Sequence, residues 1–407
     1  MGEKIFIAKE STSQQILAEL LEQRSKRYGF RVKLSESDPS NRVEYLYDAQ
    51  GMTPVRMDFD VEKFEYGSWA DIWFVKNNFP CMVRSSGVVD YQLDPDDYSL
   101  RADGTGGSDV ANEAYDGNAM SAIPCVWYKR WTDGEYYYFV ACEEQYDESF
   151  CADVHTDKNG IVQPYKYAAM FEGSIIGETL RSISGKLPES GTTAAQELGY
   201  AKANGDAWTI KEWGVWCLIA DLLILMGKST DTQAVYGNGY IISNSVMENL
   251  LETGTLNTKG QFFGYNDRTH AMKVFHMENW WGERWDRIVG LVVDYGIVKA
   301  QISSCEHDYD FKGTNYEILG NILPDQSGYQ SRVYSGRIGT FPVTADGREA
   351  AYECDFVNVR KDRVVVSLVG GSYTDGKKCG ARYLVCADSE TSKGALIGAS
   401  LSLKKPT

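Results

Sequence analysis

Residues 207–226 constrain the fold more than any other segment, because they predict a helix that is apolar on nearly every side. The apolar residues are Trp208, Ile210, Trp213, Val215, Trp216, Leu218, Ile219, Leu222, Leu223, Leu225 and Met226. Such a helix is stable only when other elements cover all of its faces. The longest apolar run, Val215 to Met226, is interrupted by Asp221 and is well short of the roughly 20 apolar residues that a bilayer span needs. We therefore expect a core helix that is buried nearly all round.

The length and net charge of the chain limit the class of protein that it can be. A chain of 407 residues can bury one large core or two ordinary ones, so it does not need disulfides or metals to stay folded. Its net charge of -16 argues against binding to nucleic acid or to an anionic membrane. The 26 tyrosines and 10 tryptophans suit both a core with wet edges and a binding surface.

Cysteine usage and the N-terminus indicate a reduced compartment. The nine cysteines form no Cys-x-x-Cys pair, and there are only four histidines, so neither a disulfide framework nor a zinc site is predicted. Residues 1–7 do not resemble a secretory signal. We expect buried thiols, synthesis in a cytoplasm and no membrane insertion.

The first part of the chain predicts a helix followed by strands. Residues 11–27 carry apolar side chains at helical spacing and favour a helix that docks on the strands or serves as an oligomerising or anchoring element. Residues 42–47 and 55–59 are typical of strands. The composition changes near Tyr66, so we expect a small α/β N-terminal segment over 1–65 and a second domain over 66–407.

The second domain is predicted to consist of many short strands. Residues 126–131 and 136–140 are aromatic and β-favouring, and Asp133-Gly134 between them is a turn signal, which predicts a hairpin. No repeat with a period of 20 to 50 residues is visible. A few helices among many short strands indicate the α+β class.

Motifs for catalysis or metal binding are weak. The acidic stretch between Asp90 and Asn118 lacks the spacing of a calcium loop and is better explained by solvated turns. Gly371 to Lys377 has the spacing of a phosphate loop, but Lys378 replaces the Ser or Thr that would hold magnesium. Glycoside hydrolysis by a pair of carboxylates stays an open alternative, although no sequence feature indicates a particular pair. We predict no cofactor and no metal site.

The C-terminal end predicts a frame that holds an irregular surface. The strand-like segment Arg363–Val369 runs into Gly370-Gly371-Ser372-Tyr373, and a second apolar segment covers 397–403. About two dozen mostly polar residues separate them. Long loops between rigid strands often carry binding residues.

Three motifs carry a resemblance to a known family. They are Asn279-Trp280-Trp281-Gly282 with Trp285, then Gly370-Gly371-Ser372-Tyr373, then Ile397-Gly398-Ala399-Ser400-Leu401. In this order they resemble the C-type-lectin-like fold of formylglycine-generating enzymes and of the variable proteins diversified by retroelements. Residues 116–120, 180–185 and 226–233 look like segments of phage and prophage structural proteins with this fold. The similarity spans roughly 66–404.

The resemblance offers one enzymatic alternative. Formylglycine-generating enzymes use two copper-binding cysteines, and the matching positions here are Asp375 and Gly380. Cys379 and Cys386 lie nearby but not at the required places. Because a soft metal would lack its ligands, we expect no oxidase activity. The calcium-binding triplets of animal lectins are also absent.

The resemblance also implies a ligand-binding face and a core beneath it. In the retroelement-diversified proteins this face lies between Gly-Gly-Ser and the last strand, and Tyr and Arg are frequent at binding hot spots. Trp213, Trp280, Trp281 and Trp285 are expected in the core. The predicted ligand-binding residues are Tyr373, Thr374, Asp375, Lys377, Lys378, Arg382, Tyr383, Ser389, Glu390 and Thr391.

These expectations combine into a non-enzymatic phage virion protein. We expect a tail-fibre tip or receptor-binding protein that binds a bacterial cell-surface protein or glycan and contacts other virion proteins. We also expect a homo-oligomer, with a trimer favoured by analogy. If the gene lies beside a retroelement, we expect the protein to be diversified by it. The alternative is a structural capsid or tail decoration protein without receptor contact, in which the same loops are buried against neighbours.

Overall fold

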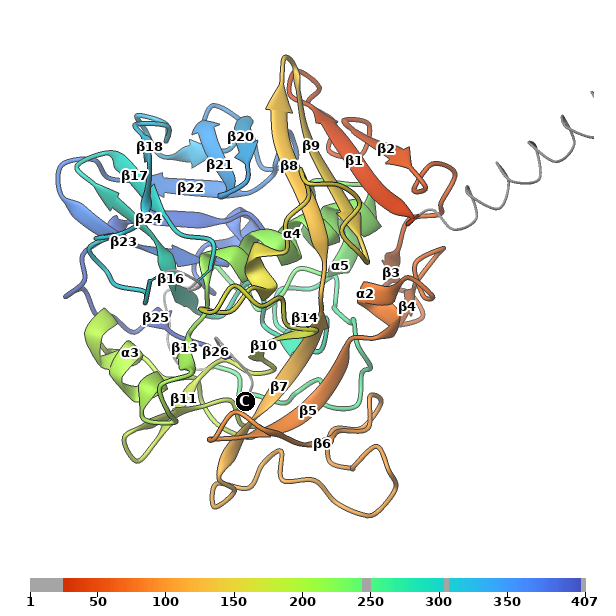
Figure 1. Ribbon diagram of the computed structural model, residues 1–407, viewed down its shortest axis with the longest axis vertical. Helices are drawn as coiled ribbons and strands as arrows, with labels where there is room; N and C mark the ends of the chain where they lie inside the picture. The colour runs from red at the N-terminus through yellow and green to blue at the C-terminus, as the bar shows by residue number, and fades with distance from the viewer. Residues whose placement is uncertain (1–24, 244–249, 304–306, 404–407) are drawn as a thin grey trace, which may run out of the picture.

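The computed structural model describes residues 25–243, 250–303 and 307–403. Its centre is helix α4 (Trp213–Gly227), in which every residue is buried. The helix packs against β1, β16 and β21, which belong to three different sheets. Figure 1 shows α4 crossing the middle of the molecule with strands around it. The predicted core helix is confirmed, but it begins at Trp213, because residues 208–210 form a strand instead.

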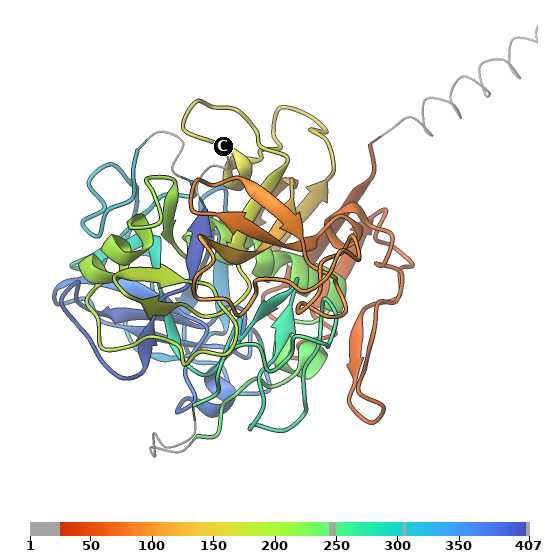
Figure 2. The same ribbon diagram turned by 90° about the horizontal axis from the view of Figure 1, so that it is seen from below.

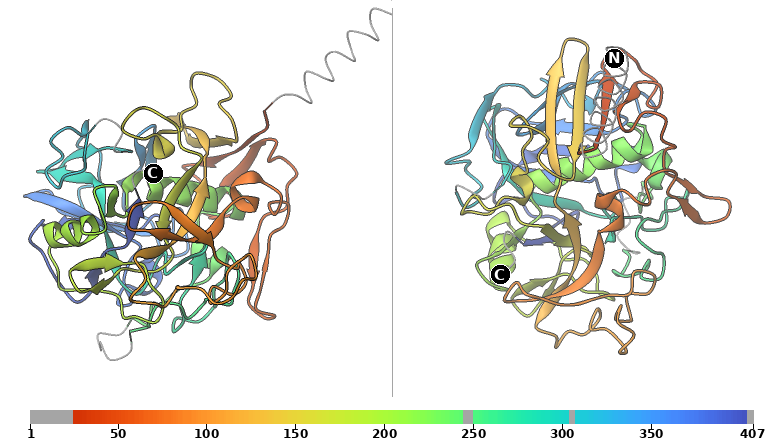
Figure 3. Two further views of the ribbon diagram at one scale, coloured as in Figure 1. Left: turned by 60° about the horizontal axis from the view of Figure 1, so that its bottom comes forward. Right: turned by 45° about the vertical axis from the view of Figure 1, so that its right-hand side comes forward.

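A four-stranded antiparallel sheet covers one side of α4. Its order is β2-β1-β9-β8, and β8 lies at an edge. Figure 3 shows the long β8–β9 hairpin beside β1, with α4 behind it. The predicted hairpin is confirmed. The strands are β2 (Val43–Tyr47), β1 (Arg27–Lys33), β9 (Tyr136–Cys142) and β8 (Trp127–Asp133).

A six-stranded sheet contains the last strand of the chain. Strand β26 pairs with both β10 and β13, so the C-terminal end is tied into the middle of the fold. Strands β5 and β6 lie toward the viewer in Figure 2. In sheet order the strands are β13 (Trp208–Ile210), β26 (Leu401–Leu403), β10 (Tyr165–Ala169), β7 (Gly117–Pro124), β5 (Phe79–Arg84) and β6 (Val89–Gln92).

The largest sheet carries the C-terminal motifs. Strand β16 is its longest strand, and β25 (Ile397–Gly398) pairs with it in parallel. The other strands follow the order β18-β17-β16-β23-β24-β22-β19. Their bounds are β18 (Glu317–Gly320), β17 (Ile297–Ala300), β16 (Trp285–Asp294), β23 (Val364–Val369), β24 (Leu384–Asp388), β22 (Phe356–Val359) and β19 (Gly328–Tyr329).

Short elements complete the fold. Helix α3 (Ala194–Lys202) begins with a capping box, in which Thr193 and Gln196 satisfy each other's backbone amides. Four two-stranded pieces are β3 (Arg56–Asp58) with β4 (Lys63–Glu65), β11 (Ser174–Ile176) with β12 (Thr179–Arg181), β14 (Lys273–Val274) with β15 (Met277–Glu278), and β20 (Arg332–Gly336) with β21 (Gly339–Thr344). Within the described ranges, the remaining helices are α2 (Trp73–Lys76), α5 (Thr232–Tyr236), and the 3₁₀ turns η1 (Asp153–His155) and η2 (Gly376–Lys378).

Most of the predicted aromatic core is confirmed. Trp213, Trp280 and Trp281 are buried, and the Trp216 ring stacks on that of Trp280 at 5.0 Å. Trp285 is half-buried, because its indole lies at the margin and donates to Asp375. The β-rich architecture with few helices is likewise as the sequence predicts.

The first segment joins the main core. Strand β1 pairs with β9 along its whole length, and Phe30 and Val43 belong to the same apolar cluster as α4. The described residues before Tyr66 therefore have no separate core. The predicted helix over 11–27 lies outside the described residues except for its last three, and Arg27 already begins β1. In the described part of the chain, no helix is both long and apolar enough to cross a membrane.

Candidate ligand-binding site

The predicted C-terminal loop is interrupted by a core strand. Residues 384–388 form β24, which pairs with β23 on one side and with β22 on the other. The physical reason is the apolar run Leu384-Val385-Cys386, whose side chains are all buried. The expectation of one continuous exposed loop between 372 and 393 is therefore wrong.

Three of the ten predicted ligand-binding residues are buried. Tyr373 and Tyr383 are each 2% exposed, and Arg382 is 7% exposed. Tyr373 packs beside Tyr240, Tyr383 joins a small apolar cluster with Leu368, and Arg382 pairs with Asp221. These side chains are committed to the interior, so their predicted place on an exposed contact surface is wrong.

The other seven predicted residues lie at two separate places. Thr374, Asp375, Lys377 and Lys378 precede β24, whereas Ser389, Glu390 and Thr391 follow it, so an extended strand separates the groups. All are half-buried except Thr391, which is exposed.

Several of these seven residues have internal partners. Asp375 accepts hydrogen bonds from Trp285 Nε1 at 2.7 Å and from the Ser372 amide at 2.8 Å. Lys377 donates to Asn238, and Lys378 lies 4.8 Å from the centre of the Phe356 ring. Ligand contact by the seven stays a prediction.

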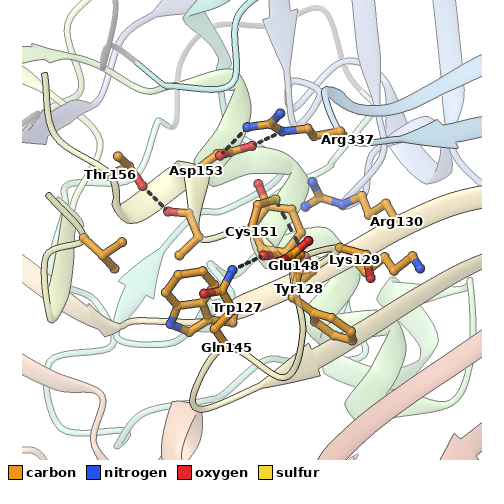
Figure 4. A pocket seen from close by; sticks show the side chains of 14 residues that line it. Trp127, Tyr128, Lys129, Arg130, Gln145, Glu148, Cys151, Asp153, Thr156 and Arg337 are labelled. Carbon is orange, nitrogen blue, oxygen red and sulfur yellow. Dashed lines mark hydrogen bonds and ion pairs between the residues drawn. The ribbon is translucent and has the colours of Figure 1, made fainter. Parts of the chain in front are cut away.

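An open pocket lies elsewhere, at the edge strand β8. It has a volume of about 380 Å³ and is lined by residues 127–130, 145, 148–153, Thr156, Val162 and Arg337. We call it the β8 pocket. The loop after β9 returns to this edge, because the amides and carbonyls of Tyr128 and Cys151 bond to each other at 2.8 and 3.0 Å. Figure 4 shows the lining side chains that converge from β8, this loop and Arg337.

Successive side chains of β8 point to opposite faces, so the strand contributes two kinds of side chain to the pocket lining. Trp127 and Lys129 are half-buried, whereas Tyr128 and Arg130 point inward and are buried. At the rim, Arg337 forms a bidentate pair with Asp153, with N–O distances of 2.7 and 2.9 Å. This partnership raises the pKa of Arg337, so the guanidinium stays charged. The pocket thus combines an aromatic ring, fixed charges and buried polar atoms.

Arg130 is the most unusual group of the β8 pocket. Its Nε donates to Asp221, but its Nη1 and Nη2 have no hydrogen-bond partner among the described residues. The hydroxyl of Tyr128 has none there either, and its ring lies 4.3 Å from the Arg130 guanidinium. Buried polar groups are normally hydrogen-bonded, because leaving one unpaired costs free energy. These donors are therefore suited to a ligand.

Sequence reasoning missed this site although one signal was present. Asp221 is the sole charged residue of α4, and a buried carboxylate requires cationic partners. The sequence does not show that the partners are Arg130 and Arg382, because these residues come from segments far apart along the chain. The convergence depends on the tertiary packing around α4.

Comparison with known proteins gives little guidance. No protein-family profile matches the chain. No curated protein matches it either. Among solved structures, one similar chain is described as "Major Tropism Determinant M1 Variant", with a TM-score of 0.27 and 10% identity over 80% of this chain and 71% of that chain. A similarity of this size does not establish a common fold.

Proposed function

We propose that the chain is a non-enzymatic host-recognition protein of a bacteriophage or prophage particle, with a C-type-lectin-like fold, and that the β8 pocket contacts the receptor. One observation carries the binding role: buried donors of Arg130 and Tyr128 without protein partners line an open pocket of about 380 Å³. Ligand pockets in proteins commonly have volumes of roughly 300–1,000 Å³. The assignment to a phage particle rests on the resemblance of the three sequence motifs.

The cysteines near the Gly-Gly-Ser motif support a binding role over an oxidase role. Cys379 is buried and donates to the Ser372 carbonyl, and burial raises the pKa of its thiol well above the ordinary value. Burial also raises the pKa of Cys386 to about 12. A thiolate is the form that reacts and binds metals, so both residues are suited to packing. In the described part of the chain, no group of His, Cys, Asp and Glu side chains is arranged to hold a metal ion.

A particle with several copies would gain avidity. A rigid sheet edge lowers the entropy cost of ordering the contact residues, and several weak contacts then act together. We propose a homo-oligomer, with a trimer favoured, as the form that displays the pockets. Its partners would be a bacterial surface protein or glycan and the neighbouring virion proteins.

The experiment compares two tryptophans of the same strand. Labelled full-length protein is added to a panel of intact bacteria, and the bound fraction is measured for the wild type, Trp127→Ala and Trp131→Ala. Both are half-buried residues of β8, but only Trp127 lines the pocket, whereas Trp131 stacks on Tyr138 at 4.5 Å.

We expect Trp127→Ala to weaken cell binding by about tenfold or more, since aromatic anchors dominate interfaces. Trp131→Ala should leave cell binding near the wild-type level, and circular dichroism checks that both variants are folded. Failure of the wild type to bind any cell surface would contradict the proposal. Equal losses in the two variants would contradict the assignment of the pocket.

A further inference from the structure

Two guanidinium groups share one buried carboxylate at the centre of the fold. Arg130 bonds to Oδ2 of Asp221, and Arg382 Nη2 lies 2.5 Å from Oδ1. The side chains of all three residues are at most 5% exposed. Two positive charges against one negative charge leave one cation without a counterion.

The neighbouring groups do not supply the missing negative charge. Glu353 already pairs with Arg42 at 3.0 Å, and both of their side chains are fully buried. Asp355 accepts from the Arg382 amide, but burial raises its pKa well above the ordinary value and favours the neutral acid. Tyr137 donates its hydroxyl to Glu353 and carries no charge of its own.

The uncompensated charge faces the β8 pocket. The unpaired Nη1 and Nη2 of Arg130 belong to a side chain that lines a space of about 380 Å³. Arg382 lines a space of about 10 Å³, which can hold no more than a water molecule. Of the two guanidinium groups, only that of Arg130 belongs to a residue lining a space of ligand size, and both side chains are buried. Figure 4 shows the Arg130 guanidinium directed toward Asp153 and Cys151 across the pocket.

The remaining lining favours a negatively charged sugar. Lys129, Arg130 and Arg337 contribute three cations, against two carboxylates from Glu148 and Asp153. The pocket is thus net positive on a chain with a net charge of -16. Trp127 adds an aromatic surface, which suits the apolar face of a ring.

We propose that the β8 pocket binds a carboxylate-bearing sugar, with the planar fork of Arg130 donating two parallel hydrogen bonds to the carboxylate. Guanidinium and carboxylate match in this bidentate geometry. Tyr128 contributes a hydroxyl donor, and Trp127 packs on the sugar ring. This inference rests on the proposed function, because it names the chemical class of the receptor.

The test uses two sugars that differ in one group. Methyl β-glucuronide and methyl β-glucoside are titrated into the full-length protein, and binding is followed by calorimetry and by tryptophan fluorescence. The glucuronide should bind about tenfold tighter or more, because only its carboxylate can pair with Arg130. Glucose 6-phosphate tests whether any anion suffices, and it should bind more weakly than the glucuronide.

Two matched variants locate the interaction. Arg130→Met and Arg382→Met each remove one guanidinium from Asp221 and leave a single buried pair. Arg130→Met should weaken glucuronide binding by about 30-fold or more, whereas Arg382→Met should weaken it by less than about fivefold. If Arg130→Met does not fold, the comparison of sugars on the wild type still decides.

Three results with the wild-type protein would overturn the inference. They are equal binding of glucoside and glucuronide, tighter binding of the phosphate, and no saturable glucuronide binding up to about 50 mM, which lies beyond the useful range of a weak site. Equal losses in the two variants would also overturn it. If cell binding depends on Trp127 but the glucuronide does not bind, only the proposed chemical class of the ligand is rejected. Glucuronide binding without any cell binding would reject host recognition instead.

Discussion

Arg130 and Arg382 bond to the same carboxylate, yet they face different surroundings. Arg382 belongs to the C-terminal region that the sequence predicts as a contact surface, and it lies beside a closed space of about 10 Å³. Arg130 belongs to a hairpin that the sequence predicts only as structure, and it lies on an open pocket of about 380 Å³. The difference shows that residue type alone does not locate a binding site. What matters is whether the donors of a buried charge can reach an outside partner.

The largest expected effect comes from the shared carboxylate. Asp221→Asn leaves the guanidiniums of Arg130 and Arg382 buried without their counterion. We expect the free energy of unfolding to fall by about 3–5 kcal/mol, which is typical when one partner of a buried ion pair is removed. Urea denaturation measures the change.

The control for this substitution is Arg130→Met. It leaves Asp221 paired with Arg382, so we expect a loss of about 1 kcal/mol or less, since apolar replacements of buried charges are often nearly neutral. Similar losses for the two variants would show that the excess of cations at Asp221 is not a real feature of the fold.

A second prediction sharpens the contrast within the C-terminal region. Tyr373→Ala removes a side chain that is 2% exposed, so we expect a loss of about 3 kcal/mol in unfolding free energy. Thr391→Ala changes an exposed residue and should alter stability by no more than about 0.5 kcal/mol. Thermal and urea denaturation give both values. If the Tyr373→Ala protein had wild-type stability and impaired cell binding, the result would support the exposed loop that the sequence predicts.

Local pattern predicts much of the fold, whereas the site depends on long-range packing. The aromatic, β-favouring arms and the Asp133-Gly134 turn predict the β8–β9 hairpin because these signals lie within a few residues. The apolar circumference of α4 predicts its burial for the same reason. Strand β24 was missed because its apolar triplet lies in a polar segment and is stabilised by pairing with β22 and β23.

The meeting of Arg130 with Asp221 could not be predicted, since 91 residues separate them. A lone acid in an apolar helix indicates that a cation must reach it. The sequence does not indicate which strand supplies that cation, nor whether it remains open to solvent.

The last expected effect is a dependence of stability on pH, and it belongs to the C-terminal region. Glu283 lies beneath Tyr373, whose amide donates to the Glu283 carbonyl at 3.0 Å. Its carboxyl accepts from the Leu251 amide at 2.8 Å and from Asn279, which also donates to Glu172 at 3.0 Å. Burial is the main cause that raises the pKa of Glu283 from 4.5 to about 8.

The direction of the pH effect follows from which state holds the proton. Between pH 4.5 and about 8 the folded protein keeps a proton on Glu283 that the unfolded chain releases, so stability falls as the pH rises. The slope from this group is about 1.4 kcal/mol per pH unit and ends near the folded pKa. Glu283→Gln removes this titration. Between pH 5 and 8 the unfolding free energy of the wild type should therefore fall relative to that of the variant. Parallel stability curves for the two proteins would show that Glu283 is ionised in the folded state and that its burial is offset by its neighbours.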